Sequence, residues 1–302
     1  MRCLPTTRAI VLLGASAFLD CLAPTRLRGL EVRHDVAYGH ADGVALLLDV
    51  GIPQGQGPFP VAILVHGGGW ARGDKGGSDK PGDSADITPW FAPLSQGGVL
   101  WFSINYRMAP AHRWPACLED VQTAVRWVKA HAADYQGDPR RIALFGHSAG
   151  GHLACLAAVE AGDDTRVQAV VGCAPVTDSE YELPGRGGMV SSSLQALFGV
   201  GKEVTPPVLQ ILRETAPIQH VHPGLPPFLL IQGDADKTVP IQETRNFMAK
   251  LQADHVPVEW IAIPGAPHRL LSWQQFDPHW TDRVVEWLQR TLATAPDAIK
   301  SK

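Results

Sequence analysis

Short apolar runs alternate with amphipathic stretches along the chain from residue 31 to residue 293. Apolar runs bounded by Gly, Pro or Asp are typical of buried strands, and apolar residues that recur every three or four positions are typical of helices. The pattern predicts strands at residues 31–38, 44–50, 59–66, 98–106, 141–146, 167–173, 226–233 and 258–264. It predicts helices at residues 85–96, 116–132, 149–160, 241–252 and 281–293.

The order of these elements predicts an α/β fold. Strand and helix in alternation indicate a mostly parallel central sheet with helices on both faces. The first two strands differ, because only the turn Ala41-Asp42-Gly43 separates them. A connection this short predicts an antiparallel hairpin at the start of the sheet.

One connection breaks the alternation, between Cys173 and Phe228. Its periodicity is weak, and connections of this length in a compact domain are usually functional or contain small helices of their own. We therefore predict a lid over the site at residues 178–217. The alternative is a solvated insertion that does not contact the substrate.

The N-terminal segment has the pattern of a secretory signal. Arginines at positions 2 and 8 precede an apolar stretch centred on residues 10–13, which is followed by the small residues Ala15-Ser16-Ala17. We predict a signal peptide at residues 1–17, a linker at 18–30, and a secreted or periplasmic protein. A disordered or interfacial leader is the alternative. The apolar stretch is too short to span a bilayer, so no stable membrane span is expected.

Composition and charge limit the possible partners. The 302 residues are 45% hydrophobic and 19% charged, which suits one large core, expected at residues 31–293 with a tail at 294–302. The formal net charge is -4, with no basic block, so no nucleic-acid partner is expected. No Cys or His spacing is typical of a metal site, and we expect no cofactor. Cys155 and Cys173 occupy ordinary positions for buried free thiols.

Ser148 lies where a predicted strand turns into a predicted helix, in the segment LFGHSAGGHLA. Gly146 and Gly150 allow a sharp turn there, which would raise the serine Oγ above the sheet and next to a helix N-terminus. Such a serine is typical of a nucleophile. Alternatively, Ser148 is only the N-cap of the helix.

A second motif, AILVHGGGW, follows an earlier predicted strand. Backbone N–H groups of glycines can approach a tetrahedral oxyanion without obstruction by Cβ. We predict an oxyanion hole formed by the N–H groups of Gly68, Gly69 and Ala149, and a substrate contact by Trp70. A phosphate-binding loop is excluded, because no Gly-Lys-Ser/Thr ending follows.

A serine nucleophile needs a histidine and a carboxylate at the carboxyl ends of the strands. Asp234 and Asp236 both follow a predicted strand, and Asp236, on the descending loop, is the preferred acid. His268 follows the last predicted strand, whereas His255 precedes it and His279 lies beside the final helix. We therefore predict His268 as the base. His66 is expected to brace the glycine loop, and His147 to support the turn.

The order Ser148, Asp236, His268, together with HGGGW and GHSAGG, resembles the α/β-hydrolase fold. Within that fold, these motifs and the segment YRMAPAHRWPACLEDVQTAVRWV resemble esterases and lipases related to hormone-sensitive lipase and to feruloyl-esterase-like proteins. The resemblance covers roughly residues 35–292. Gln232 and Arg269 depart from residues that are common in such proteins. His147, where the hormone-sensitive-lipase branch usually has Asp, favours the feruloyl-esterase-like branch.

These observations predict a serine carboxylic-ester hydrolase without a cofactor, acting through an acyl-enzyme on a small-molecule or carbohydrate-linked ester. An amide or peptide hydrolase, such as an arylformamidase-like enzyme, would use the same three residues. A binding protein without activity is the third hypothesis, and the presence of all three residues argues against it.

Overall fold

A computed structural model of the protein describes residues 30–77 and 87–293. The predicted signal peptide (1–17), the predicted linker up to residue 29 and the predicted tail (294–302) lie outside the described residues. The start of the helix predicted at 85–96 also lies outside them.

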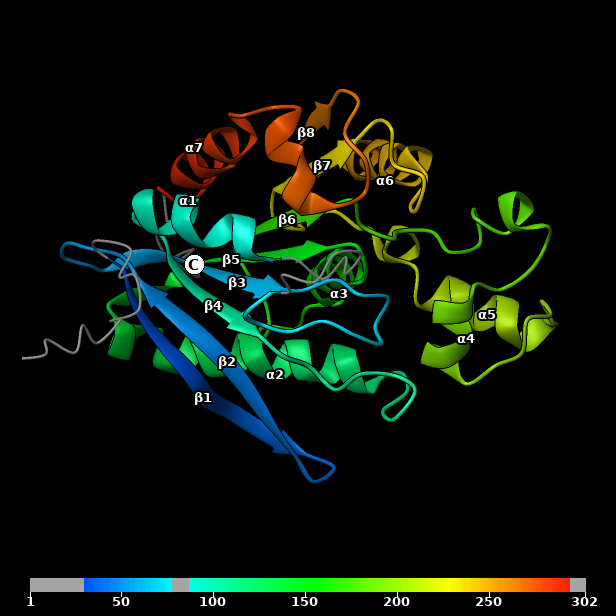
Figure 1. The fold of residues 1–302 in the computed structure, drawn as a ribbon, viewed down its shortest axis with the longest axis horizontal. Helices are drawn as coiled ribbons and strands as arrows, with labels where there is room; N and C mark the ends of the chain where they lie inside the picture. The colour runs from blue at the N-terminus through cyan, green and yellow to red at the C-terminus, as the bar shows by residue number, and fades with distance from the viewer. Residues whose placement is uncertain (1–29, 78–86, 294–302) are drawn as a thin grey trace, which may run out of the picture.

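The strands form one twisted sheet of eight, in the order β1-β2-β4-β3-β5-β6-β7-β8 (Figure 1). β1 pairs antiparallel with β2, and β2 with β4, whereas the other neighbouring pairs are parallel. The predicted opening hairpin and mostly parallel sheet are thus confirmed. The strands are β1 (Glu31–Ala41), β2 (Val44–Ile52), β3 (Phe59–Val65), β4 (Leu100–Ile104), β5 (Gly137–His147), β6 (Ala169–Cys173), β7 (Phe228–Gly233) and β8 (Val258–Ile263).

Helices cover both faces of the sheet, as predicted. α1 and α7 pack on one face, and α2, α3 and α6 on the other (Figure 1). The α-helices are α1 (Phe91–Gln96), α2 (Ala116–His131), α3 (Ala149–Val159), α4 (Ser192–Phe198), α5 (Pro206–Glu214), α6 (Ile241–Ala253) and α7 (Trp280–Leu292). The 3-10 helices are η1 (Thr88–Trp90), η2 (Ala132–Tyr135), η3 (Pro184–Arg186), η4 (Pro217–His220) and η5 (Leu270–Gln275).

The strands supply two separate cores because alternate side chains point to opposite faces. On β3, Val61, Ile63 and Val65 belong to the core that also includes residues of α2, α3 and α6, whereas Ala62 and Leu64 belong to the core that includes residues of α1 and α7. Apolar residues at every position therefore suit a strand that is covered on both sides. The rigid sheet that results fixes the loops at its carboxyl edge.

The long connection after β6 contains small helices of its own. Residues 178–217 include η3, α4 and α5, and lie beyond the end of the sheet that also carries the loops after β3 and β7 (Figure 1). Leu194 and Leu212 anchor the segment in the larger of the two cores. The segment is thus packed against the domain on one side, and the function of a lid stays a prediction.

Three cysteines, Cys117, Cys155 and Cys173, are buried and free. The prediction of buried free thiols at Cys155 and Cys173 is confirmed. Among the described residues, no helix is both long enough and apolar enough to cross a membrane.

Candidate active site

The turn between β5 and α3 holds Ser148 in a conformation that few residues other than glycine adopt. Its φ is +55° and its ψ is -119°, a sparsely populated region that costs about 1–3 kcal/mol. The Ser148 N–H donates to the carbonyl of Cys173 at 2.9 Å, which ties the turn to β6. The Ser148 side chain makes no capping hydrogen bond, so the alternative that it only caps α3 is wrong.

Two glycines make this turn sterically possible. A Cβ on Gly146 would lie 2.0 Å from the carbonyl oxygen of Gly150. A Cβ on Gly150 would lie 2.2 Å from the carbonyl oxygen of Val65, at the end of β3. Both distances are far below van der Waals contact, so α3 can approach β3 and β5 only with glycine at these positions, as the motif predicts.

His268 joins Ser148 to Asp236. Its Nε2 lies 2.9 Å from the Ser148 Oγ, and its Nδ1 lies 2.7 Å from the Asp236 Oδ2. Since Asp236 only accepts, the Nδ1 carries the hydrogen and the Nε2 is free to accept the serine proton. The structure thus brings the three predicted residues together in one hydrogen-bonded chain.

Four donors surround the buried Asp236 carboxylate. Its Oδ1 accepts the backbone N–H groups of Thr238 and Val239 at 2.8 Å and 3.0 Å, and its Oδ2 accepts from Gln232 and His268. Burial by itself raises the pKa of Asp236, but the hydrogen bonds from His268, Thr238 and Val239, and the attraction between the carboxylate and a protonated His268, outweigh it and lower the pKa below its ordinary value. The carboxylate is therefore ionised at neutral pH and can orient the imidazole.

The other candidate residues have different partners. The Asp234 Oδ1 accepts the N–H of Gly265 at 2.6 Å, and so closes the loop after β8. His255 precedes β8, at the opposite edge of the sheet, and His279 pairs with Asp282 on the surface at 3.0 Å. These three residues lie outside the hydrogen-bonded chain.

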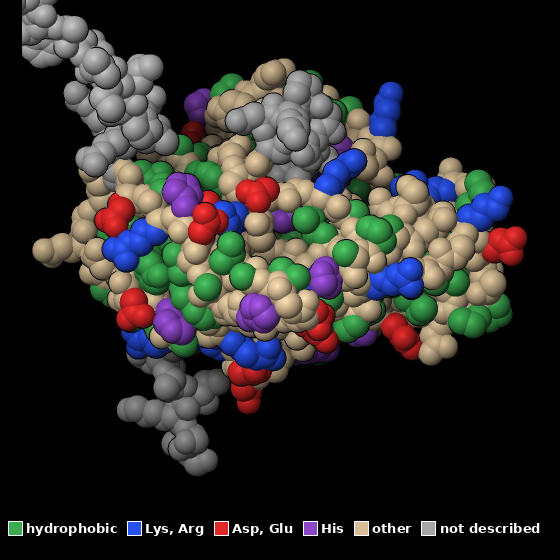
Figure 2. Space-filling model, turned by 60° about the horizontal axis from the view of Figure 1, so that its bottom comes forward, with side chains coloured by type: hydrophobic (Ala, Val, Ile, Leu, Met, Phe, Trp, Pro, Cys, Tyr) green, Lys and Arg blue, Asp and Glu red, His purple; other side chains and the backbone are tan. Residues whose placement is uncertain are grey.

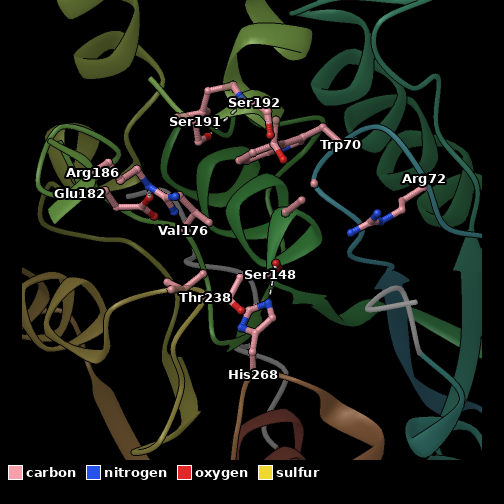
Figure 3. A pocket seen from close by; sticks show the side chains of 15 residues that line it. Trp70, Arg72, Ser148, Val176, Glu182, Arg186, Ser191, Ser192, Thr238 and His268 are labelled. Atoms are coloured by element: carbon pink, nitrogen blue, oxygen red, sulfur yellow. Dashed lines mark hydrogen bonds and ion pairs between the residues drawn. The ribbon is translucent and has the colours of Figure 1, made fainter. Parts of the chain in front are cut away.

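A cavity of about 230 Å³ opens over Ser148 and His268 (Figure 3). Gly69, Trp70 and Ala149, three of the residues with a predicted role at the site, line it, whereas Gly68 packs against Arg72. The first N–H groups of a helix have no partner within the helix, so the Ala149 N–H at the start of α3 can serve a ligand. Gly69 and Ala149 are the predicted oxyanion donors that this cavity reaches directly.

His66 and His147 hold the loops around the site. The His66 Nδ1 donates to the carbonyl of Gly67 at 2.7 Å, and its ring stacks on Tyr106 at 4.4 Å. The His147 Nε2 donates to the backbone carbonyl of His268 at 3.0 Å. The expectation that His66 braces the glycine loop agrees with its contacts, and His147 contacts the histidine loop as well as forming part of the turn.

Gln232 is a site residue that the sequence argument did not assign. Thr244 donates to the Gln232 Oε1 at 2.6 Å, which fixes the orientation of the amide. The Gln232 Nε2 then donates to the Asp236 Oδ2 at 3.0 Å and to the Val239 carbonyl at 2.8 Å. Gln232 thus positions Asp236. The sequence signal for this role was that Gln232 stands where related proteins commonly have a different residue.

His152 is a second residue that the sequence argument missed. It lies on α3, one turn after Ser148, and is buried. The Trp70 Nε1–H donates to its Nδ1 at 3.2 Å, so its Nε2 carries the hydrogen and donates to the Thr215 carbonyl at 2.8 Å. A neutral histidine thereby joins Trp70 of the cavity to the end of α5.

The buried His152 is expected to weaken the fold in acid. Burial lowers its pKa to about 4, from about 6.5 in an unfolded chain. Between these values the unfolded state binds a proton that the folded state does not, so stability falls as the pH falls from about 6.5 to about 4. Between pH 7 and pH 5 this amounts to about 2 kcal/mol.

His152→Gln can keep both hydrogen bonds but cannot titrate. We expect the unfolding free energy of the parent, measured in urea, to fall by about 2 kcal/mol more between pH 7 and pH 5 than that of the variant. His279→Gln, at an exposed position, is the control and should behave as the parent does. If the unfolding free energy falls equally in the parent and in His152→Gln between pH 7 and pH 5, this account is wrong.

The sheet order, the serine on its strained turn and the residues that follow β7 and β8 define the class of the protein, which is an α/β-hydrolase. The comparisons with known proteins narrow this class. The BD-FAE family model matches residues 48–251, and the chain belongs to this family.

Among curated proteins, the chain is similar to "Esterase LipC" of Mycobacterium tuberculosis, with 35% identity over 78% of this chain and 59% of that protein. Among solved structures, it is similar to "Thermogutta terrifontis esterase 2", with a TM-score of 0.65 and 26% identity over 91% of this chain and 99% of that one. A "carbohydrate esterase from gut microbiota" shares the fold, with a TM-score of 0.72 and 24% identity over 87% and 97% of the two chains.

The chain spans between 49% and 59% of the length of three curated relatives, of which LipC is one. All three are named as esterases or carboxylic ester hydrolases. The recognition of an esterase-type α/β-hydrolase from the motifs of the sequence is therefore confirmed.

Proposed function

We propose that the protein is a serine carboxylic-ester hydrolase that acts through an acyl-enzyme. The observation that carries the proposal is the hydrogen-bonded chain from Ser148 through His268 to Asp236, which ends in a cavity. The names of the curated relatives, which are esterases, support ester hydrolysis as the reaction. A binding protein would have no use for the strained serine and its ordered base.

In the proposed reaction the Ser148 Oγ attacks the ester carbonyl while His268 accepts its proton. The N–H groups of Gly69 and Ala149 stabilise the oxyanion, with the Gly68 N–H as a third donor. His268 then returns the proton to the leaving alcohol. A water molecule, activated by the same imidazole, releases the acid and restores Ser148.

The lining of the cavity favours a short or polar substrate. Only part of it is apolar, from Trp70, Val176, Leu194 and Val239. The predicted lid segment, residues 178–217, supplies hydroxyl groups from Ser191, Ser192 and Ser193 (Figure 3). We propose that this segment contacts the substrate, and that the substrate is a short-chain or carbohydrate-linked ester.

Two matched comparisons test this proposal. We expect kcat/KM to be at least about a hundredfold higher for 4-nitrophenyl acetate than for 4-nitroacetanilide, because the ester carbonyl is the more reactive and 4-nitrophenolate can leave unprotonated, whereas the amine must first receive a proton from His268. We expect 4-nitrophenyl decanoate to be hydrolysed at least about tenfold less efficiently than the acetate, because the cavity holds few apolar side chains. Faster turnover of the anilide would instead indicate an amide hydrolase.

A further inference from the structure

We propose that the cavity selects esters that carry an anionic group, and that Arg72 is the residue that recognises the anion. This inference rests on the proposed function, because it names the substrate class of the same site. Three features of the site support it: the position of Arg72, the charges that line the cavity, and the neutral donors around the cavity.

The glycine turn fixes Arg72 at the edge of the cavity. The Ala71 N–H donates to the carbonyl of Gly68 at 3.3 Å, which turns the chain back on itself before Arg72. A Cβ on Gly68 would lie 2.1 Å from the carbonyl oxygen of Arg72 and 3.0 Å from its Cγ. The backbone and stem of Arg72 therefore pack directly on the turn, and Gly68, with a φ of +108°, is required for this contact.

The side chain of Arg72 reaches from this turn into the site. Arg72 lines the cavity together with Ser148 and His268, and in Figure 3 its guanidinium points inward from the side opposite Arg186. A guanidinium can donate two parallel hydrogen bonds to a carboxylate, which makes it a specific receptor for a planar anion.

The charges that line the cavity leave Arg72 uncompensated. Among the described residues, three ionisable side chains of Arg and Glu line it, from Arg72, Arg186 and Glu182. The Arg186 Nε pairs with the Glu182 Oε2 at 2.5 Å, and Glu182 is the only carboxylate among the described lining residues. In the part of the chain that the structure describes, Arg72 has no carboxylate within ion-pair distance. The described part of the lining thus carries one excess positive charge.

A neighbouring buried carboxyl group does not change this balance. Glu243 lies next to Glu182, and its Oε2 accepts the N–H groups of Thr177 and Asp178, each at 3.1 Å. Burial, and then the charge of Glu182, raise the pKa of Glu243 well above its ordinary value. The raised pKa favours the uncharged form of Glu243, and Glu182 is the carboxylate that pairs with Arg186.

The positive cavity contrasts with the rest of the molecule. The chain has a formal net charge of -4, and acidic and basic side chains are interspersed on the face shown in Figure 2. The excess charge in the cavity is thus local, and a concave site of one sign attracts ligands of the other. Hydroxyl groups of Ser192, Ser193 and Thr238 complete a lining of donors that suits an oxygen-rich anion.

The test compares esters that differ only in one charge, in two arms. With the anion on the acyl side, 4-nitrophenyl hydrogen glutarate is compared with its terminal amide. With the anion on the alcohol side, 3-acetoxybenzoate is compared with 3-acetoxybenzamide. The measured quantity is the kcat/KM of the anionic ester divided by that of the neutral one, for the parent, Arg72→Gln, Arg72→Lys and the control Arg166→Gln.

Arg166→Gln is a matched control, because it removes one positive charge before β6, at the opposite edge of the sheet. We expect Arg72→Gln to lower the ratio about tenfold in at least one arm, and that arm assigns the anion to the acyl or the alcohol side. Arg72→Lys should retain part of the preference, and Arg166→Gln all of it. The preference of the parent should also decrease as salt is added.

An unchanged ratio in both arms for Arg72→Gln, which includes equal fold-losses on the charged and the neutral esters, would overturn the inference. That result leaves ester hydrolysis by the parent intact. If the parent hydrolyses none of the four esters, charged or neutral, the proposed function itself is wrong. The failure of the inference and the failure of the proposed function are thus distinguishable.

Discussion

Ser148→Ala is expected to fold as the parent does and to lose at least about three orders of magnitude in kcat on a neutral aryl ester. The loss is large because the proposed reaction has one nucleophile, and neither His268 nor the oxyanion donors can form the acyl-enzyme. The residual rate would come from binding and from stabilisation of the oxyanion.

The fold should tolerate this change for a structural reason. Ser148 and Ala share the same cost at a φ of +55°, since both carry a Cβ. Among the described residues, the Ser148 side chain makes its only hydrogen bond to the His268 Nε2, and Ser148 is 7% exposed, so the cavity can supply water to the imidazole. We expect the unfolding free energy to change by less than about 1 kcal/mol.

A fluorophosphonate probe separates loss of the nucleophile from loss of the fold. The probe should label the parent at Ser148 and leave Ser148→Ala unlabelled, as read from the intact mass. The control Ser95→Ala removes a hydroxyl from α1, on the other face of the sheet, and should be labelled as the parent is. If Ser148→Ala retains turnover and the probe labels no other residue in it, the assignment of Ser148 as the nucleophile is wrong.

The features that the sequence predicted well are local. The turn at Ser148 depends on Gly146 and Gly150, which are within two positions of it, and the strands follow from apolar runs that the sheet buries on both faces. The choice between His255 and His268 needed only the side of β8 on which each residue lies. Parallel topology places the carboxyl ends of neighbouring strands together, so sequence order was enough.

The features that the sequence could not supply depend on contacts between distant segments. His152 is defined by Trp70, 82 positions before it, and by Thr215, 63 positions after it. Gln232 is oriented by Thr244, which the chain brings back on α6. A polar residue on an apolar stretch signals that a partner exists, but only the packing of the helices on the sheet identifies it.

The charge balance of the cavity is also a property of the folded chain. Arg72 precedes Glu182 and Arg186 by more than a hundred positions. The charges of Glu182 and Arg186 cancel because the two side chains form an ion pair. From the sequence, the lid segment and the glycine loop were separate predictions. Their side chains meet over Ser148 only because α4 is packed into the core.

The hydrogen bonds around Asp236 determine what Asp236→Asn should do. Two backbone N–H groups donate to the Oδ1, so the amide oxygen of an asparagine must take that position. The amide nitrogen then occupies the position of the Oδ2 and faces two other donors, the His268 Nδ1–H and the Gln232 Nε2. His268 can relieve this conflict only by moving its hydrogen to the Nε2.

A hydrogen on the Nε2 faces the Ser148 Oγ, and the imidazole can then no longer accept the serine proton. We therefore expect Asp236→Asn to lower kcat on a neutral ester by about 10³- to 10⁴-fold, the size of loss that a wrong tautomer causes in a serine hydrolase.

Asp234→Asn is the matched control. The oxygen of its amide can still accept the Gly265 N–H, so kcat should stay within about threefold of the parent. Both variants are measured on 4-nitrophenyl acetate at pH 8, with thermal unfolding recorded alongside. A larger loss in Asp234→Asn, with both variants folded, would transfer the role of the acid to Asp234 and would require the loop after β7 to rearrange when substrate binds.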